Sequence, residues 1–494
     1  MSEPAIILQI VTWFGVAVLS GVAIVNIVTV AAAGRAVRRA VRRRVASEDD
    51  AAMASPLTPP ITIIVARSGP MVAERVRRLL DLRYPELEVI VVDAVREGTL
   101  GRLRAEFALV DIPAVVPRLV TTPARVVSTA VSRDGTRLLV VEVEGQPSYA
   151  DLLNAGVNFA RARLLCALRP GLTLADDALL RLARPFMDNP RDAEAAVAIA
   201  RPLNGCTVRQ GRVIATGWPT SGLARVRLVE QLRGSVVAQA VRPRRRSRAD
   251  AGGMLLVRRD HVIELGGFRA RAGGENADLL GRLQRRGDRI EHRVRFVAVP
   301  NPICWREVRE TWAGTAEAHR TAGYATARVL DAESRRDQGP GRLRRWWQTA
   351  VFLIPLVQLV TGLAAAAGVL LGHVDPWLGA LLLTVGLFVP ATLSIAALTI
   401  EELAFPRRGG LRALAGMIAA AVVVPAGYQQ VAEWWRLRGL LAPAPPVPAA
   451  PVVTTERGVE RVDPGTRPTI GGRGPATLRR RRAARRGSRG KTGR

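Results

Sequence analysis

The sequence predicts a polytopic membrane protein in which hydrophobic helical segments flank an α/β domain. Residues 5–33, 350–372 and 377–400 contain no Asp, Glu, Lys or Arg, and a helix needs about 20 apolar residues to cross the hydrocarbon core of a bilayer. Between the first two of these stretches, short β-branched runs alternate with segments whose apolar residues recur at helical spacing. Such alternation is typical of a mostly parallel sheet with helices on both faces.

The first hydrophobic stretch is predicted to be a retained membrane anchor. It is too long for the apolar core of a secretory signal, no basic segment precedes it, and arginines follow it in place of a cleavage site. A shorter fourth stretch runs from Ala413 to about Gln430. The predicted units are a membrane helix at 1–34, a basic linker at 35–56, the α/β domain at 57–335, transmembrane or interfacial helices at 345–440, and an unfolded Pro/Ala- and Arg-rich tail at 441–494.

Arginine clusters predict the orientation of these helices. Arg35–Arg44 is dense in positive charge and Met1–Pro4 carries no Lys or Arg, so we expect the N-terminus outside and the α/β domain in the cytoplasm of a multi-pass plasma-membrane protein. His373–Asp375 is then an external connection. If residues 413–430 cross, the basic tail lies outside, against the positive-inside rule. A re-entrant or interfacial helix would keep the tail in the cytoplasm.

The formal net charge of +30 is carried almost entirely by arginine, and Lys491 is the only lysine. A strongly basic chain can bind nucleic acid, but no DNA- or RNA-binding motif accompanies the charge and aromatic residues make up only 4% of the chain. We therefore predict no nucleic-acid partner. The arginine block after the first helix, and with it the tail Arg473–Arg494, is expected to contact anionic membrane lipid. Function as a tether through these blocks is the weakest alternative.

Cysteine and histidine usage points away from disulfides and metal clusters. Cys166, Cys206 and Cys304 are isolated and odd in number, which argues against a disulfide framework. The four histidines are scattered and offer no metal-ligand spacing, so no metal site is predicted from them.

Local patterns predict the elements of the α/β domain. Buried runs predict strands, and apolar residues at helical spacing predict helices. The predicted strands are Ile61–Val65, Leu87–Val92, Arg137–Val143 and Leu164–Leu168, and the predicted helices are 71–82, Asp151–Arg161 and Asp176–Phe186. Leu223–Gly234 alternates charged and apolar residues. It predicts an amphipathic helix that lies either along the membrane surface or against the sheet.

Five segments follow one another in order along the chain: "PPITIIV" with "LLDLRYPELEVIVVD", "LLNAGVNFARA" with Asn154 and Gly156, "GGMLLVRRDHVIELGGFR", "CWREVRET" and "GYQQVAEWWRLRGL". In sequence and order they resemble the membrane-bound family-2 glycosyltransferases, relatives of the cellulose, hyaluronan and poly-N-acetylglucosamine synthases. The resemblance runs from about Pro59 to Leu441. It implies a GT-A fold, a Rossmann-like α/β sheet, with a nucleotide-sugar donor, Mg²⁺ or Mn²⁺, and a glycan moved through the membrane helices.

The positions that carry chemistry in that family depart from its pattern. A transferase of this kind needs a carboxylate pair to hold a hard cation against the diphosphate and another carboxylate to deprotonate the acceptor. The metal-binding "DAD" falls on Arg169, Pro170 and Gly171, and the "GED" with the catalytic base falls on Gly274, Glu275 and Asn276. Further family positions fall on Ser68, Gly69, Pro70, Asp93, Ala94, Ala318, Thr321 and Ala322.

Four motif positions of the family lack the residues that catalysis needs, although the segments around them still align with the family. This combination predicts an inactive family member, a pseudoenzyme, of the cell envelope. Asn276 can hydrogen-bond a sugar but cannot act as a base. The candidate site residues are Asp93 and Arg169 for a nucleotide, and Glu275 and Asn276 at the degenerate base position. The predicted partners are membrane lipid, a glycan or nucleotide-sugar, and an active glycosyltransferase. The alternative is a working transferase that uses Arg169 and Glu275, possibly without a metal; Mg²⁺ or Mn²⁺ is expected only if activity remains.

Overall fold

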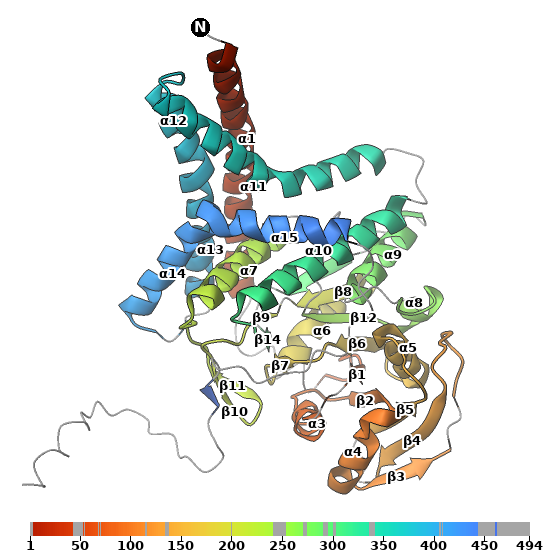
Figure 1. The fold of residues 1–494 in the computed structure, drawn as a ribbon. Helices are drawn as coiled ribbons and strands as arrows, with labels where there is room; N and C mark the ends of the chain where they lie inside the picture. The colour runs from red at the N-terminus through yellow and green to blue at the C-terminus, as the bar shows by residue number, and fades with distance from the viewer. Residues whose placement is uncertain are drawn as a thin grey trace, which may run out of the picture.

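The structure of the 494-residue chain is a computed structural model (Figure 1). It describes residues 3–42, 53, 55–67, 69, 71–113, 116–133, 138–198, 200–240, 253–269, 274–289, 295–299, 303–334, 341–404, 407, 409–442 and 460–461.

A nine-stranded sheet forms the centre of the α/β domain. Its strands are β1 (Ile61–Ala66), β2 (Leu87–Ala94), β3 (Leu109–Ile112), β4 (Val126–Ser132), β5 (Leu138–Val143), β6 (Leu164–Leu168), β8 (Ala193–Ala198), β12 (Met254–Arg258) and β13 (Arg295–Val299). They lie in the order β13-β8-β12-β6-β1-β2-β5-β4-β3. Only β4 and β12 run against the common direction of the sheet. The predicted α/β class with a mostly parallel sheet is confirmed.

Helices cover both faces of this sheet. On one face, α3 (Val72–Leu80), α4 (Thr99–Phe107) and α6 (Ala178–Asp188) pack against side chains such as Ile63 and Val65. On the other face, α5 (Tyr149–Phe159), α8 (Arg259–Glu264) and α9 (Glu275–Arg289) pack against Ile64 and its neighbours. Successive strand residues point to opposite faces, so a strand buried on both sides reads as the continuous apolar run that the sequence shows.

The helix α5 has a well-defined start and a close approach to the sheet. Ser148 and Asp151 form a reciprocal capping box that satisfies two of its first backbone N–H groups. Gly156 faces β1 so closely that a Cβ atom there would lie 2.6 Å from Cγ2 of Ile64. The absence of a side chain at this position therefore sets the distance between helix and sheet.

Two small sheets extend the domain. One contains β7 (Leu172–Leu174), β14 (Cys304–Arg306) and β9 (Arg201–Pro202), and the other contains β10 (Thr207–Arg209), β11 (Arg212–Ala215) and β15 (Glu460–Arg461). A short 3-10 helix, Val95–Glu97, follows β2. In the segment 441–494, which we expected to be unfolded, β15 pairs with β10. Apart from 441–442 and this strand, that segment lies outside the described residues.

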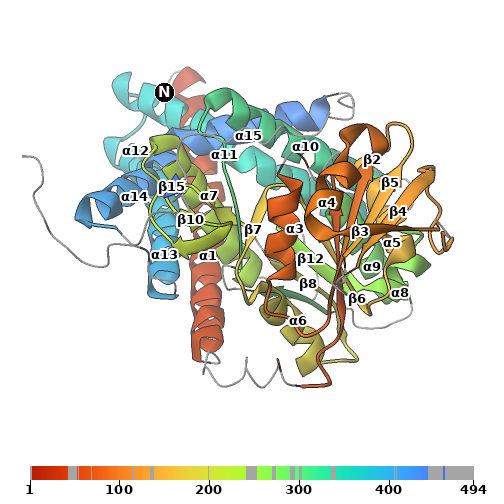
Figure 2. The same cartoon turned by 90° about the horizontal axis from the view of Figure 1, so that it is seen from below.

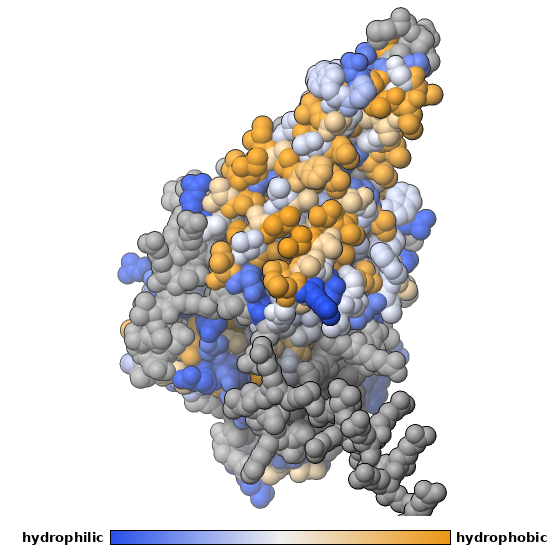
Figure 3. All heavy atoms as spheres, turned by 90° about the vertical axis from the view of Figure 1, so that its left-hand side faces the viewer, coloured by the Kyte–Doolittle hydropathy of each residue, from blue (hydrophilic) through white to orange (hydrophobic). Residues whose placement is uncertain are grey.

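Long apolar helices project from the α/β domain. They are α1 (Glu3–Arg42), α11 (Gly341–Leu370), α12 (Pro376–Leu383), the π-helical turn Thr384–Phe388 and α13 (Val389–Ala404). By length and composition, Ile6–Ala32, Pro376–Leu403 and Leu411–Leu441 are each sufficient to cross a membrane, and Val357–Leu370 is a shorter apolar helix. The start of α1 and the α11–α12 connection lie at the end of this bundle away from the sheet (Figure 1), where Trp13 and Trp377 contact each other with ring centroids 5.8 Å apart. The face of the bundle seen in Figure 3 is largely hydrophobic.

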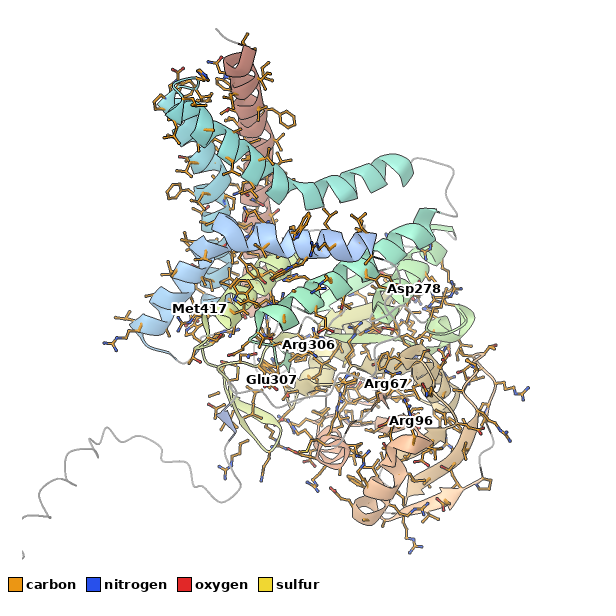
Figure 4. All side chains as sticks on the ribbon, viewed as in Figure 1. Arg67, Arg96, Asp278, Arg306, Glu307 and Met417 are labelled. Carbon is orange, nitrogen blue, oxygen red and sulfur yellow. The ribbon has the colours of Figure 1, made fainter. Side chains whose placement is uncertain are left out.

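A layer of helices lies between the sheet and this bundle (Figures 1 and 2). It consists of α7 (Gly222–Ala240), α10 (Trp312–Ser334), α14 (Leu411–Val423), the π-helical turn Val424–Tyr428 and α15 (Gln429–Leu441). Leu228 and Val229 of α7 are buried together with Leu393 and Met417 of the neighbouring helices. The helix expected at Leu223–Gly234 therefore packs mainly against other helices, and Met417 lies on the inner side of α14 (Figure 4).

Candidate functional site

The candidate site lies at the carboxyl ends of three neighbouring parallel strands. Arg67 follows β1, Asp93 lies near the end of β2, and Arg169 follows β6. β2 and β6 flank β1 on its two sides and run parallel to it, so these residues reach the same edge of the sheet. In open α/β sheets this edge is where ligands bind.

The structure brings two of the predicted site residues together. Arg169 Nη2 lies 3.9 Å from Oε2 of Glu275, and the two side chains are only 18% and 5% exposed. Glu275 begins α9, and Asn276 beside it is also buried. The cationic Arg169 therefore occupies a position at which the resemblance expects carboxylates. It faces Glu275, which directly precedes Asn276, the residue at the expected position of the catalytic base.

Two further side chains surround this ion pair. Arg75 of α3 donates from Nη2 to the backbone oxygen of Arg169 at 2.6 Å. Burial lowers the pKa of the Arg75 guanidinium to about 10, so it stays charged at neutral pH. Burial also raises the pKa of the Tyr149 phenol to about 12; Arg169 opposes this rise and Glu275 adds to it. With Tyr149 neutral, two guanidinium groups and one carboxylate give the group a net positive charge.

The segments that resemble the family build the scaffold of the site. Asn154 of α5 accepts a hydrogen bond from the backbone N–H of Phe268 at 2.7 Å and donates to its carbonyl oxygen at 2.9 Å. Gly267 beside it has φ +77°, and a Cβ atom there would lie 2.4 Å from Oδ1 of Asn154. The "NAG" and "GGFR" segments are thus in direct contact, and glycine is required at this turn.

Arg282 joins this turn to the helix that carries Glu275. Its guanidinium donates to the carbonyl oxygens of Leu265 and Gly267, each at 2.7 Å. It also pairs with Asp278 at 2.8 Å on the same helix (Figure 4). Because Arg282 and Asp278 are buried, these contacts fix the start of α9 relative to α5.

Asp93 is buried and engaged with its own surroundings. Its carboxylate accepts a hydrogen bond from the Thr99 hydroxyl at 3.0 Å and from the backbone N–H of Ala94 at 3.1 Å. These bonds hold the start of α4 against the end of β2. Asp93 lies near the end of β2, and part of its hydrogen-bonding capacity serves the local turn.

The residues at the expected metal position do not fit a divalent cation. Mg²⁺ and Mn²⁺ prefer carboxylate and other oxygen ligands, whereas Arg169 contributes a guanidinium and Pro170 and Gly171 contribute no side-chain oxygen. Within the described part of the chain, no group of three or more His, Cys, Asp or Glu side chains could hold a metal ion. Asp176 and Asp177, a few residues further along, pair with Arg78 and Arg181, respectively.

The remaining family positions are partly visible. Ala318, Thr321 and Ala322 lie on the exposed face of α10, whereas His319 between them is buried. Ser68 and Pro70 lie outside the described residues. The sequence reasoning missed Arg75 and Tyr149, and no local signal distinguishes Arg75 from the many other arginines of the chain.

No family model and no curated protein matches the sequence. Among solved structures, the chain is similar to a mannosyltransferase, PcManGT from Pyrobaculum calidifontis in complex with GDP-Man and Mn²⁺, at 17% identity and a TM-score of 0.41, covering 85% of this chain and 97% of that one. It is also similar to glucosyl-3-phosphoglycerate synthase from Mycobacterium tuberculosis in complex with Mg²⁺ and UDP, at 14% identity and a TM-score of 0.32, covering 59% and 84%.

Proposed function

We propose that this chain is a membrane-bound, family-2 glycosyltransferase-like protein of the cell envelope that has lost catalysis and acts by binding. The proposal rests on the five sequence segments that resemble this family and on the geometry of the site at the sheet edge. Function belongs to the site and not to the scaffold. In this chain the segments that resemble the family contact one another, while residues other than the expected carboxylates stand at the positions that would carry catalysis.

The observation that carries the proposal is the buried pair of Arg169 and Glu275. Its guanidinium stands where a transferase of this family holds its metal-binding carboxylates, and like charge disfavours a divalent cation beside it. The Glu275 carboxylate faces this cation at 3.9 Å and is only 5% exposed, so an acceptor hydroxyl would have to reach a nearly buried side chain to give it a proton. Asn276 cannot take that proton in its place.

The ligand that best fits this group is the diphosphate of a nucleotide or nucleotide-sugar, held without a metal ion. A guanidinium can bind phosphate oxygens through two parallel hydrogen bonds, and Arg169 remains 18% exposed. Asp93 and Asn276 are proposed to contact the nucleotide and the sugar. The protein would then present a bound nucleotide or glycan, or would assemble with an active transferase, at the cytoplasmic face of the plasma membrane.

Calorimetric titration of the detergent-purified protein with UDP and UDP-sugars tests this proposal. We expect binding of equal affinity in Mn²⁺ and in EDTA, weakened about tenfold or more in Arg169→Ala because one charge-assisted contact is lost. Arg184→Ala is the matched control, because Arg184 makes an ion pair of the same length with Asp188 on α6 away from the site. Binding that requires Mn²⁺, or that is unchanged in Arg169→Ala, would contradict the proposal.

The same geometry favours one alternative, a metal-independent transferase that uses Arg169 to stabilise the leaving diphosphate and Glu275 as the base. Turnover that persists in EDTA and disappears in Glu275→Gln would establish this alternative.

A further inference from the structure

The segment Leu411–Leu441 is apolar and long enough to cross a membrane, yet both of its ends contact the α/β domain. At its start, a Cβ atom on Gly409 would lie 2.5 Å from the Trp218 ring, and one on Gly416 would lie 2.3 Å from the Arg225 guanidinium of α7. At its end, a Cβ atom on Gly439 would lie 2.0 Å from the backbone oxygen of Arg320 on α10. A helix that crosses the bilayer once cannot have both ends on one side.

A hairpin that crosses the whole bilayer and returns is excluded by length. The segment bends at the π-helical turn Val424–Tyr428, which contains Pro425, and leaves two helices, α14 and α15, of 13 residues each. At about 1.5 Å per residue each is about 20 Å long, whereas the hydrocarbon core is about 30 Å thick.

The chain on both sides of this segment also stays with the α/β domain. Before it, Glu401 at the end of α13 forms a buried ion pair with Arg201 of β9 at 2.9 Å and contacts Arg407 at 3.4 Å. After it, β15 pairs with β10. The chain therefore leaves the segment on the side on which it entered.

The two faces of α14 and α15 differ in chemistry. Toward α7 and α10, α15 places Glu433 and Arg436, and Arg436 pairs with Glu230 of α7. The opposite face exposes an apolar stripe at helical spacing. The stripe consists of Leu411, Leu414, Ile418, Val422, Val431 and Trp434. Arg438 lies at its edge, one turn beyond Trp434, with its guanidinium 5.1 Å from the Trp434 ring.

We infer that α14 and α15 form an interfacial helix pair that docks the α/β domain onto the lipid surface of the leaflet it faces. A helix with an apolar stripe, tryptophan and arginine at its edge and a polar opposite face is suited to the boundary between headgroups and acyl chains. The stripe is continuous with the membrane bundle because α14 packs on α13 through Met417, Ala421 and Leu393. The basic tail then lies on the same side as the α/β domain, in agreement with the positive-inside rule.

Cysteine labelling tests which side each segment occupies. Leu441→Cys, Leu371→Cys and Leu57→Cys are suitable single substitutions because these side chains are 74%, 64% and 83% exposed, and the native cysteines are all buried. We expect a membrane-impermeant maleimide to label Leu441→Cys and Leu57→Cys in the same vesicle orientation and Leu371→Cys in the opposite one. Labelling of Leu441→Cys together with Leu371→Cys would overturn the inference. Reaction of all three in detergent confirms that the sites are accessible.

Depth-dependent quenching tests the lipid contact itself. An environment-sensitive fluorophore on Ile418→Cys should be quenched more strongly by lipids with a nitroxide near the headgroup than by lipids with a nitroxide at the chain end. Ala17→Cys, exposed near the middle of the α1 span, is the matched deep reference and should show the reverse order. A deep pattern at Ile418→Cys, or no quenching by either lipid, would overturn the inference. Neither experiment depends on the ligand proposed for the sheet edge.

Discussion

The Arg169 guanidinium and the Glu275 carboxylate come from the end of β6 and the start of α9, and they meet at 3.9 Å with little exposure to solvent. A buried charge that loses its partner is costly, often by more than the pair itself contributes. A substitution of either residue should therefore change the free energy of unfolding as well as the chemistry of the site. Its effect should also depend on whether the other residue is present.

A double-mutant cycle measures this link. We expect Arg169→Ala to lower the free energy of unfolding by about 2–4 kcal/mol, because the buried Glu275 carboxylate loses the guanidinium with which it forms an ion pair. Arg169→Ala combined with Glu275→Gln should recover part of that loss, with a coupling energy of about 1 kcal/mol or more. Thermal unfolding in detergent provides the measurement. The exposed pair Arg184–Asp188, also 3.9 Å long, is the control and should show a coupling energy near zero. Equal coupling in the two cycles would contradict this interpretation of the buried pair.

Asn154→Ala tests the contact between the "NAG" and "GGFR" segments. The substitution leaves a buried backbone N–H and carbonyl of Phe268 without the amide, so we expect a loss of about 2–3 kcal/mol together with weaker nucleotide binding. Asn158→Ala is a matched control. Asn158 makes the same two-bond contact with the backbone of Val120, at 2.7 and 3.0 Å. Asn158→Ala should destabilise the protein by a similar amount but leave nucleotide binding per folded molecule unchanged. An equal effect of both variants on binding would count against a role of Asn154 in positioning the site.

Acidification should destabilise the helix layer through His319. Burial lowers the pKa of this imidazole from 6.5 to about 4; Glu230 opposes the shift, and Arg436 and Arg227 reinforce it. Between these pH values the unfolded chain binds more protons than the folded one, so the free energy of unfolding falls as pH decreases from 6.5 to about 4, by at most roughly 3 kcal/mol. His319→Gln should flatten the dependence of melting temperature on pH in that window. An unchanged slope in this variant would refute the assignment.

The close contact of α10 with α15 makes a further prediction. A Cβ atom on Gly323 would lie 2.0 Å from the backbone oxygen of Arg436, so Gly323→Ala should separate the helices and destabilise the protein by about 1–3 kcal/mol. Gly362 of α11 has no atom within 4 Å of its Cβ position. Gly362→Ala should be neutral or slightly stabilising, because alanine favours the helix more than glycine does. Melting temperatures of the two variants in detergent compare them directly.

The parallel centre of the sheet could be predicted because its strands are buried on both faces. The predicted strand Ile61–Val65 matches β1 to within one residue, and Leu164–Leu168 matches β6. β8 was not predicted. Its sequence, AEAAVA, is rich in residues that favour helices, and it becomes a strand because β12 and β13 pair with it on either side. Long-range pairing of this kind leaves no local pattern.

The site was predicted only in part, for a related reason. Arg169 and Glu275 could be named from their places in two motifs, and the structure brings them together. The positions of Arg75 and Tyr149 depend on how α3 and α5 pack at the sheet edge. An arginine on a helix in a chain this rich in arginine gives no sign of such a role. The number of membrane crossings near the C-terminus could not be predicted for the same reason. Hydropathy shows that a segment is apolar, but it does not indicate which other helix that segment contacts.

Release of UDP from UDP-sugars by the purified protein, with and without Mn²⁺ and beside Glu275→Gln, decides whether the site at the sheet edge has lost catalysis. We predict no release above background for either protein under either condition, in preparations that bind UDP. Mn²⁺-dependent release by the natural protein that disappears in Glu275→Gln would contradict the loss of catalysis, since a working carboxylate and metal would then exist at the sheet edge.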